Sequence, residues 1–243
     1  MATHFRSPVA ALAATLCVVG AGPTERLATQ EPQDYRIIMP GERLDRPPTG
    51  SWLLLEQTGH TAQLRTATPQ LTTSGRCVSW AAPDGAIALV SGPRLTPGPV
   101  RVAQLSIQSE GQPPTPISSG VRQFLTPGTR VRARLGLWQL VLSVEGEPLE
   151  DLVVGGYRIS ITSSHRTQVV LRSEQMDVSA GAERAFWFGD LDRDGFPDLI
   201  LSPGLAYLGR DVEDRSITRM LLSRPAETGN VFSSVAEAEG RRC

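Results

Sequence analysis

Residues 157–171 read YRISITSSHRTQVVL, and they carry the clearest structural pattern in the chain. Large and polar side chains alternate strictly over residues 157–162, which is typical of a strand with one buried face. The short polar segment Ser163-Ser164-His165 then precedes a second apolar run over residues 166–171. Two strands joined by so few polar residues predict an antiparallel β-hairpin.

Strand-like runs recur on both sides of this hairpin, separated by turn signals rich in Gly and Pro. The runs are residues 52–56, 62–66, 76–80, 86–91, 99–108, 130–135 and 138–144. Residues 233–239 have capping-box spacing that suits a terminal helix, and they fit a strand equally well. Frequent strands without alternating helices predict an all-β protein with an antiparallel sandwich or barrel-like domain. No repeat of 20–50 residues supports a full propeller.

The composition limits the class of partner. The chain has 243 residues and a net charge of -1, and all 24 of its cationic residues are arginine. This length allows a sizeable core without metal or disulfide support. Balanced charge without a basic stripe argues against nucleic acid as a partner. The expected partner is therefore a protein or a glycan of unknown identity.

The first 21 residues have the pattern of a signal peptide. Arg6 precedes an apolar run over residues 9–19, and the small residues Gly20 and Ala21 follow. The run is shorter than the ~20 residues that span a bilayer, so we expect cleavage, with no transmembrane segment afterwards. This predicts export to the periplasm or the cell exterior. The remaining chain divides into a flexible leader, residues 22–34, and a β-rich domain, residues 35–243, with a possible internal boundary near residues 109–119.

Signal cleavage would leave two cysteines, Cys77 and Cys243. In an oxidising compartment two cysteines can form one intramolecular disulfide. The alternative is a reactive thiol at Cys243, because the neighbouring Arg241 and Arg242 would favour its ionised form. A chain terminus is a poorly ordered place for a nucleophile. We therefore predict the disulfide.

One stretch carries chemistry: residues 184–203 read RAFWFGDLDRDGFPDLILSP. Carboxylates at alternate positions of a tightly curled loop can point at one ion, and Gly195 permits the left-handed backbone that turns the chain. A hard cation with six or seven oxygen ligands suits this cluster, and Ca²⁺ fits best. Arg193 should point outward. The expected ligands are the carboxylates of Asp190, Asp192, Asp194 and Asp198 and the carbonyl of Phe196.

The loop differs from an EF-hand, which needs Glu at its twelfth position, where this chain has Leu201. The strand–DxDxDGxxD–strand pattern of residues 185–204 resembles the calcium loops of FG-GAP, or VCBS-type, repeats in integrin alpha chains and many secreted bacterial proteins. The resemblance implies a calcium-binding β-hairpin near the C-terminus. Residues 202–204 replace the family's trailing Gly-Ala-Pro, and only one copy is present, so the family's propeller is not expected.

Enzymatic signatures are absent from the sequence: it contains no HExxH, no Gly-x-Ser-x-Gly and no phosphate-binding glycine loop. The acidic segment 147–151 is interpreted as a solvated turn. Trp52, Trp80, Trp138 and Trp187 are interpreted as core residues rather than sugar-stacking platforms. We expect a structural, binding or scaffolding role and no catalytic site. The alternative is a secreted hydrolase whose site is assembled from scattered residues, including His60 or His165.

Overall fold

The computed structural model describes residues 35–75, 77–108, 111–117, 125–150, 153–163, 166–178, 185–203, 205–207, 215–223 and 232–240. These residues form strands and no helix. The first half contains β1 (Arg36–Ile38), β2 (Trp52–Thr58), β3 (Thr61–Ala67), β4 (Leu71–Ser74), β5 (Cys77–Trp80), β6 (Ala86–Ser91), β7 (Gly98–Val102), β8 (Gln104–Gln108) and β9 (Thr115–Ile117). The second half contains β10 (Arg130–Leu135), β11 (Trp138–Glu150), β12 (Val153–Ser163), β13 (Arg166–Asp177), β14 (Ala185–Asp190), β15 (Asp198–Ser202), β16 (Leu205–Tyr207), β17 (Arg215–Ser223) and β18 (Phe232–Gly240).

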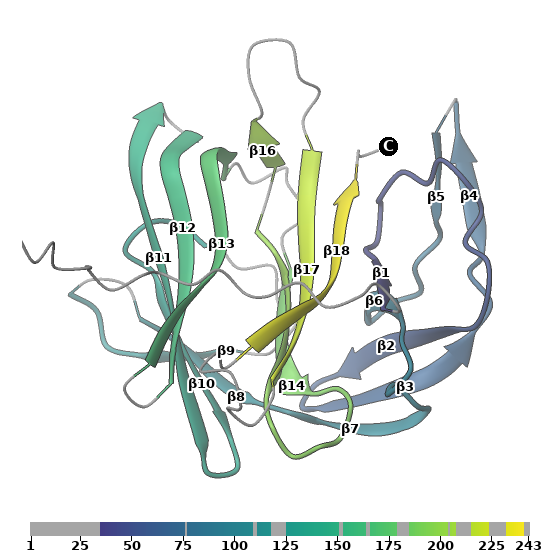
Figure 1. The fold of residues 1–243 in the computed structure, drawn as a ribbon, viewed down its shortest axis with the longest axis horizontal. Coiled ribbons are helices and arrows are strands. Elements are labelled where there is room, and N and C mark those ends of the chain that lie inside the picture. The colour runs from purple at the N-terminus through teal and green to yellow at the C-terminus, as the bar shows by residue number, and fades with distance from the viewer. Residues whose placement is uncertain are drawn as a thin grey trace, which may run out of the picture.

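Sixteen of the strands belong to one antiparallel sheet, and β4 and β5 form a separate two-stranded sheet. The large sheet runs in the order β1-β6-β2-β3-β7-β14-β15-β17-β16-β13-β12-β11-β10-β8-β9, with β18 paired to β17. In Figure 1 the strands β10–β13 lie on the left, β14–β18 in the middle and β1–β6 on the right. The predicted all-β antiparallel, barrel-like class is confirmed, and the fold is not a full propeller.

The large sheet is nearly closed and barrel-like, and the single residue Ala103 separates β7 from β8. Before Ala103, β7 pairs with β3 and β14; after it, β8 pairs with β9 and β10. The backbone N–H of Ala103 also donates to the carbonyl of Phe188 in β14, at 3.0 Å. The continuous segment β7–β8 therefore connects the part of the sheet that contains β3 and β14 to the end formed by β10, β8 and β9.

The strands β14, β15 and β17 are buried on both faces. Phe186 and Phe188 belong to the core inside the barrel, whereas Trp187 between them packs into a second core against β1, β2, β3 and β6. The same alternation holds in β15, where Leu199 faces the first core and Ile200 the second. A strand buried on both faces is apolar without interruption, which explains the apolar flanks of the aspartate-rich segment.

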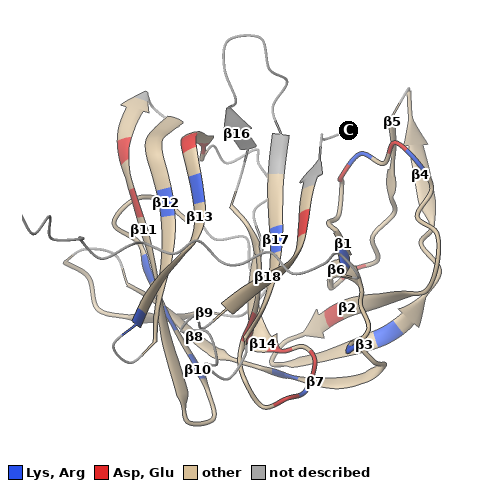
Figure 2. Ribbon diagram, in the orientation of Figure 1, with Lys and Arg blue, Asp and Glu red and all other residues tan. Residues whose placement is uncertain are grey.

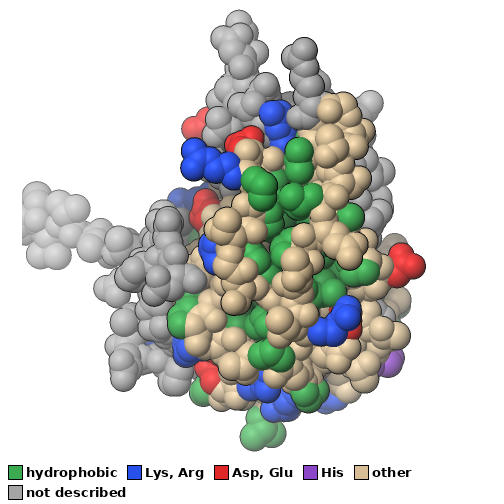
Figure 3. Space-filling model, turned by 90° about the vertical axis from the view of Figure 1, so that its right-hand side faces the viewer, with side chains coloured by type: hydrophobic (Ala, Val, Ile, Leu, Met, Phe, Trp, Pro, Cys, Tyr) green, Lys and Arg blue, Asp and Glu red, His purple; other side chains and the backbone are tan. Residues whose placement is uncertain are grey.

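A third, small core lies between the β4–β5 hairpin and strands β1, β2 and β6. Its buried members are Ile38, Trp52, Leu54, Trp80 and Leu89. The molecular face on this side carries hydrophobic side chains along its centre, with polar and charged groups around them (Figure 3). Burial confirms the prediction that Trp52, Trp80 and Trp187 are core residues, whereas Trp138 is 40% exposed.

The structure tests several of the secondary-structure predictions directly. The hairpin predicted over residues 157–171 is β12–β13, and residues 233–239 form part of strand β18 rather than a helix. The turn expected over residues 147–151 is wrong in its described part, because β11 continues to Glu150 and Glu147 pairs with Gly155. The side chains of residues 147–149 are exposed, as a solvated segment requires. None of the described residues belongs to a helix that is long and apolar enough to cross a bilayer.

Three predictions concern residues outside the described ones. The signal peptide (residues 1–21), the leader (residues 22–34) and Cys243 all lie there. Export and the Cys77–Cys243 disulfide therefore stay predictions. The strands on either side of residues 109–119, β8 and β10, are neighbours in one sheet, and a domain boundary at that place stays a prediction too.

Candidate metal centre

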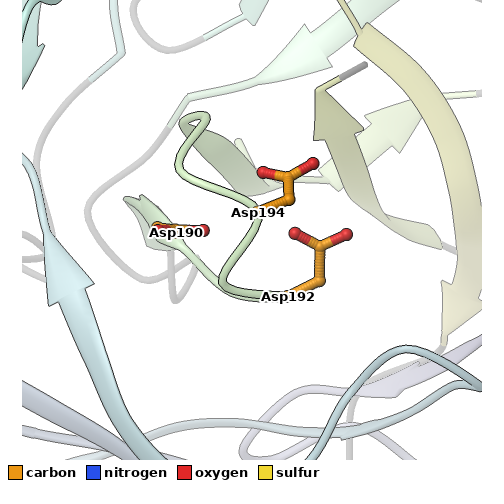
Figure 4. A group of neighbouring side chains, drawn as sticks. All are labelled: Asp190, Asp192 and Asp194. Atoms are coloured by element: carbon orange, nitrogen blue, oxygen red, sulfur yellow. The ribbon is translucent and has the colours of Figure 1, made fainter. Parts of the chain in front are cut away.

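The aspartate-rich loop joins two adjacent strands, β14 and β15, whose last pair is Gly189 with Asp198. It brings together Asp190, Asp192 and Asp194, each with a carboxylate oxygen within 4.8 Å of the others. Figure 4 shows Asp190 at the end of β14 and Asp192 and Asp194 on the loop that follows it. Three of the predicted ligands thus converge, as alternate positions on a tight loop require.

Two backbone conformations produce the curl. Arg193 has φ 60° and Gly195 has φ 91°, both in the left-handed region. Glycine adopts this region at little cost, whereas Arg193 is the single non-glycine residue that does so in the described part of the chain. The N–H of Gly195 donates to both oxygens of Asp190, each at 3.2 Å, and the N–H of Phe196 donates to Oδ1 of Asp194 at 2.9 Å. The loop is therefore closed by its own aspartates.

Asp192 is the most unusual member of the cluster. Its side chain is 1% exposed, yet neither carboxylate oxygen has a hydrogen-bond partner. The nearest positive group is the guanidinium of Arg94, with Nη1 at 3.4 Å from Oδ2. Burial and the negative charge of Asp194 raise the pKa of Asp192, while Arg94 lowers it. A buried carboxylate without hydrogen bonds is costly unless another ligand compensates it.

Asp198 has a different place from the three clustered carboxylates. It is 1% exposed, and its Oδ2 accepts hydrogen bonds from the N–H of Leu191 at 2.6 Å and of Asp192 at 3.3 Å. Its Oδ1 accepts one from the N–H of Ser223 in β17, at 3.0 Å. Burial, followed by the charge of Asp192, raises the pKa of Asp198 well above its usual value. Asp198 therefore fastens the loop backbone to β17, and a direct role as a metal ligand stays a prediction.

The loop is also attached to the connection before β7. Arg193, expected to point outward, donates from Nη2 to the carbonyls of Thr96 and of Pro97, the latter at 2.7 Å. Arg101 in β7 lies opposite Asp190 in the register of β7 with β14. The charge of Arg101 lowers the pKa of Asp190, and burial raises that pKa more strongly. These contacts hold the loop between β7 and β17.

Phe196, the predicted carbonyl ligand, connects the loop to the β10–β11 hairpin. Its ring packs against that of Trp138, with centroids 4.8 Å apart at an interplanar angle of 47°. The role of its carbonyl as a metal ligand stays a prediction. Trp138, Arg94 and Ser223 are site residues that sequence reasoning missed, because each lies far from the loop in the chain.

Chemically, the cluster can hold a metal ion. Three carboxylates held this close repel one another, and a cation between them would offset both that repulsion and the desolvation of Asp192. Among the described residues this is the one group of three or more His, Cys, Asp or Glu side chains arranged so. His60 lies outside it, in the exposed turn between β2 and β3, and His165 is not among the described residues.

Comparison with protein-family models, curated proteins and solved structures finds no match to this chain. The resemblance of the loop to FG-GAP calcium loops therefore depends on the acidic spacing alone.

Proposed function

We propose that this chain is an exported calcium-binding β protein with a structural or binding role in the cell envelope or outside the cell. Asp190, Asp192 and Asp194 would ligate Ca²⁺, and Phe196 and Asp198 would complete the coordination. The observation that carries the proposal is the buried carboxylate of Asp192, whose two oxygens have no hydrogen-bond partner. A bound cation would offset the burial of this carboxylate beyond what Arg94 supplies.

The donor set favours calcium over other metals. The clustered side chains offer only oxygen, which suits hard cations and argues against the softer, nitrogen- and sulfur-seeking ions. Calcium accepts irregular sets of six to eight oxygens, whereas magnesium demands a smaller, near-ideal octahedron. An irregular loop bridging β14 and β15 suits the larger ion. The FG-GAP-like spacing supports the same choice.

The structural role follows from what the loop touches. Its residues contact the connection before β7, the β10–β11 hairpin and β17. An ion that fixes the loop would therefore stabilise three separate parts of the sheet. Export is supported by the signal-like first 21 residues, and an extracellular compartment supplies calcium at concentrations that even weak sites can use.

Calorimetric titration of the metal-free protein tests the proposal. Calcium should bind with about one ion per chain, and magnesium should bind at least tenfold more weakly. The melting temperature should rise with calcium, since a ligand at 100 times its Kd stabilises by about 2.7 kcal/mol. Asp194→Asn should remove this rise without unfolding the protein, because Asp194 is exposed. Asp84→Asn, an exposed aspartate in the β5–β6 connection, is the matched control and should keep it. Calcium-independent melting of the native chain would refute the proposal.

A further inference from the structure

A second concave site is lined by none of the clustered aspartates. It is a cleft of about 780 Å³ between the β2–β3 turn, represented by His60, and the strands β8, β10 and β11. A smaller hollow of about 460 Å³ shares His60, Gln104 and Arg134 with it and extends the site to Arg101 in β7. The larger volume lies within the range of pockets that bind small ligands.

Two arginines supply the charge of the cleft. Arg132 and Arg134 lie two positions apart on β10, so their side chains leave the same face of the strand, about 6.6 Å apart along it. Both are exposed. Figure 2 shows this positive charge on β10 and the acidic loop between β14 and β15.

The positive charge of the cleft is not neutralised by the residues that line it. Arg134 donates from Nε and Nη2 to Oε1 of Gln104, at 3.2 and 2.5 Å, and Arg132 donates from Nη2 to Oε1 of Gln108 at 3.3 Å. These partners are neutral amides, which orient a guanidinium without cancelling its charge. In the described part of the chain no ion pair involves either arginine, and no Asp or Glu lines either hollow. Anionic groups are therefore the complementary ligands.

The other residues that line the cleft indicate what kind of molecule would carry these anionic groups. Gln104, Gln139 and Ser106 offer uncharged donors and acceptors, His60 adds an imidazole ring, and Pro116 and Ile117 add an apolar wall. The hydroxyl groups of a sugar form hydrogen bonds with amide and hydroxyl side chains such as these. The C–H face of a sugar ring packs on an apolar wall. A recessed cleft also suits a soluble chain better than the flat surface of a membrane.

We propose that this cleft binds an acidic oligosaccharide, with two anionic substituents on Arg132 and Arg134 and ring hydroxyls on the neighbouring amides. The planar guanidinium forms paired hydrogen bonds to carboxylate and to sulfate ester oxygens alike, so the shared chemistry is an oxyanion on a sugar. The two arginines lie on β10, outside the aspartate cluster, whereas Arg101 of the smaller hollow lies opposite Asp190. Sugar binding is therefore measured in calcium-free buffer, and calcium binding in a separate titration.

Calorimetry with defined sugars tests this inference at low ionic strength. Tetragalacturonic acid supplies carboxylates, a heparin-derived tetrasaccharide supplies sulfates, and cellotetraose is the neutral control. At least one acidic sugar should bind, cellotetraose should bind at least tenfold more weakly, and added salt should weaken the acidic complex. The stronger acidic ligand identifies the anion.

Variants locate the binding. The double variant Arg132→Gln/Arg134→Gln should weaken acidic sugar binding at least tenfold with an unchanged melting temperature, because both side chains are exposed. Arg130→Gln, on the same strand and face but outside the lining of both hollows, is the matched control and should stay within twofold of the native chain. Three results would overturn the proposal: no acidic sugar binds at millimolar concentration, the double variant binds normally, or only vesicles containing phosphatidylglycerol bind.

Discussion

The guanidinium of Arg94 lies 3.4 Å from the buried carboxylate of Asp192, although neither oxygen of that carboxylate has a hydrogen-bond partner. Arg94 comes from the connection between β6 and β7, and its Nε donates to the hydroxyl of Tyr35 at 3.2 Å. The arginine is therefore a partial counter-charge at the edge of the aspartate cluster. A bound cation would share the same carboxylate with it, so the two positive charges oppose each other.

Arg94→Gln should strengthen calcium binding, because it removes a positive charge beside the ion. Arg94 is 41% exposed and screened by water, so the gain should be modest, roughly threefold, or about 0.7 kcal/mol. Arg94→Lys keeps the charge and should leave the affinity nearly unchanged. Calorimetric titration measures both. Weaker binding by the Gln variant would mean that Arg94 organises the loop rather than opposing the ion.

Asp192→Asn should separate calcium binding from folding. The substitution removes a buried charge, so the metal-free variant should be at least as stable as the metal-free native protein. It also removes the ligand, so calcium should no longer raise the melting temperature. Thermal melting with and without calcium gives both quantities. A variant that is less stable without calcium would show that the Asp192 charge supports the fold by itself.

Asp198→Asn should instead destabilise the protein whether or not calcium is present. In the asparagine side chain one of the two acceptor oxygens is replaced by an NH₂ group, which cannot accept a hydrogen bond. The backbone N–H of Leu191 or of Ser223 therefore loses its buried acceptor. The expected loss is about 1–3 kcal/mol, measured by urea unfolding. Ser223→Ala is the control, because it keeps the backbone N–H and removes a hydroxyl without a partner. If the variant lost stability only in the presence of calcium, Asp198 would act mainly as a metal ligand.

Calcium should reverse the pH dependence of stability. Burial raises the pKa values of Asp190, Asp192 and Asp198 in the folded state, so the folded chain binds protons more tightly than the unfolded one. Their contribution is full below the unfolded value, near 3.8, and is lost as pH rises through the raised folded values. Without calcium, these groups should lower the melting temperature as pH rises to 7. With calcium, which binds the ionised carboxylates, stability should rise instead.

Comparison of the native chain with Asp192→Asn isolates this effect from other titrating groups, including Glu42, whose pKa is also raised by burial. In calcium-free buffer the variant should show a smaller fall in melting temperature between pH 4.5 and pH 7. An equal fall in both proteins would place the titration elsewhere.

Trp138 should report on the loop by fluorescence. Its ring packs on Phe196 and is 40% exposed, whereas the other three tryptophans are nearly buried. Calcium binding that fixes Phe196 should change the Trp138 emission. Trp138→Phe should abolish the change while keeping the calcium affinity within a few-fold. A change that persists in this variant would come from Trp187, in the strand that leads into the loop.

The local sequence pattern predicted many of the strands and the clustering of the aspartates. Strict alternation over residues 157–162 predicted a strand because one face is buried, and the acidic spacing over residues 190–194 predicted a cluster because a curled loop brings alternate side chains together. The strand at residues 147–150 was missed for the complementary reason. The side chains of residues 147–149 are all exposed, so no alternation distinguishes that part of the strand from a turn.

The remaining site residues could not be predicted because they meet only in three dimensions. Arg94, Trp138 and Ser223 come from three different connections or strands, and none lies beside the loop in sequence. Their positions depend on the order of the strands in the sheet, which the local sequence pattern does not determine. The sequence also could not show that the charges of Arg132 and Arg134 are uncompensated. This depends on which residues surround the two side chains in the folded chain.

The double burial of β14, β15 and β17 has a consequence for cooperativity. A strand that contributes Phe188 to one core and Trp187 to the other cannot leave one core without disturbing both. The two cores should therefore melt together, and backbone amides on both sides should exchange with deuterium at similar rates. The aspartate loop sits at the end of these shared strands, so an ion bound there would slow the opening of the whole sheet rather than of one hairpin.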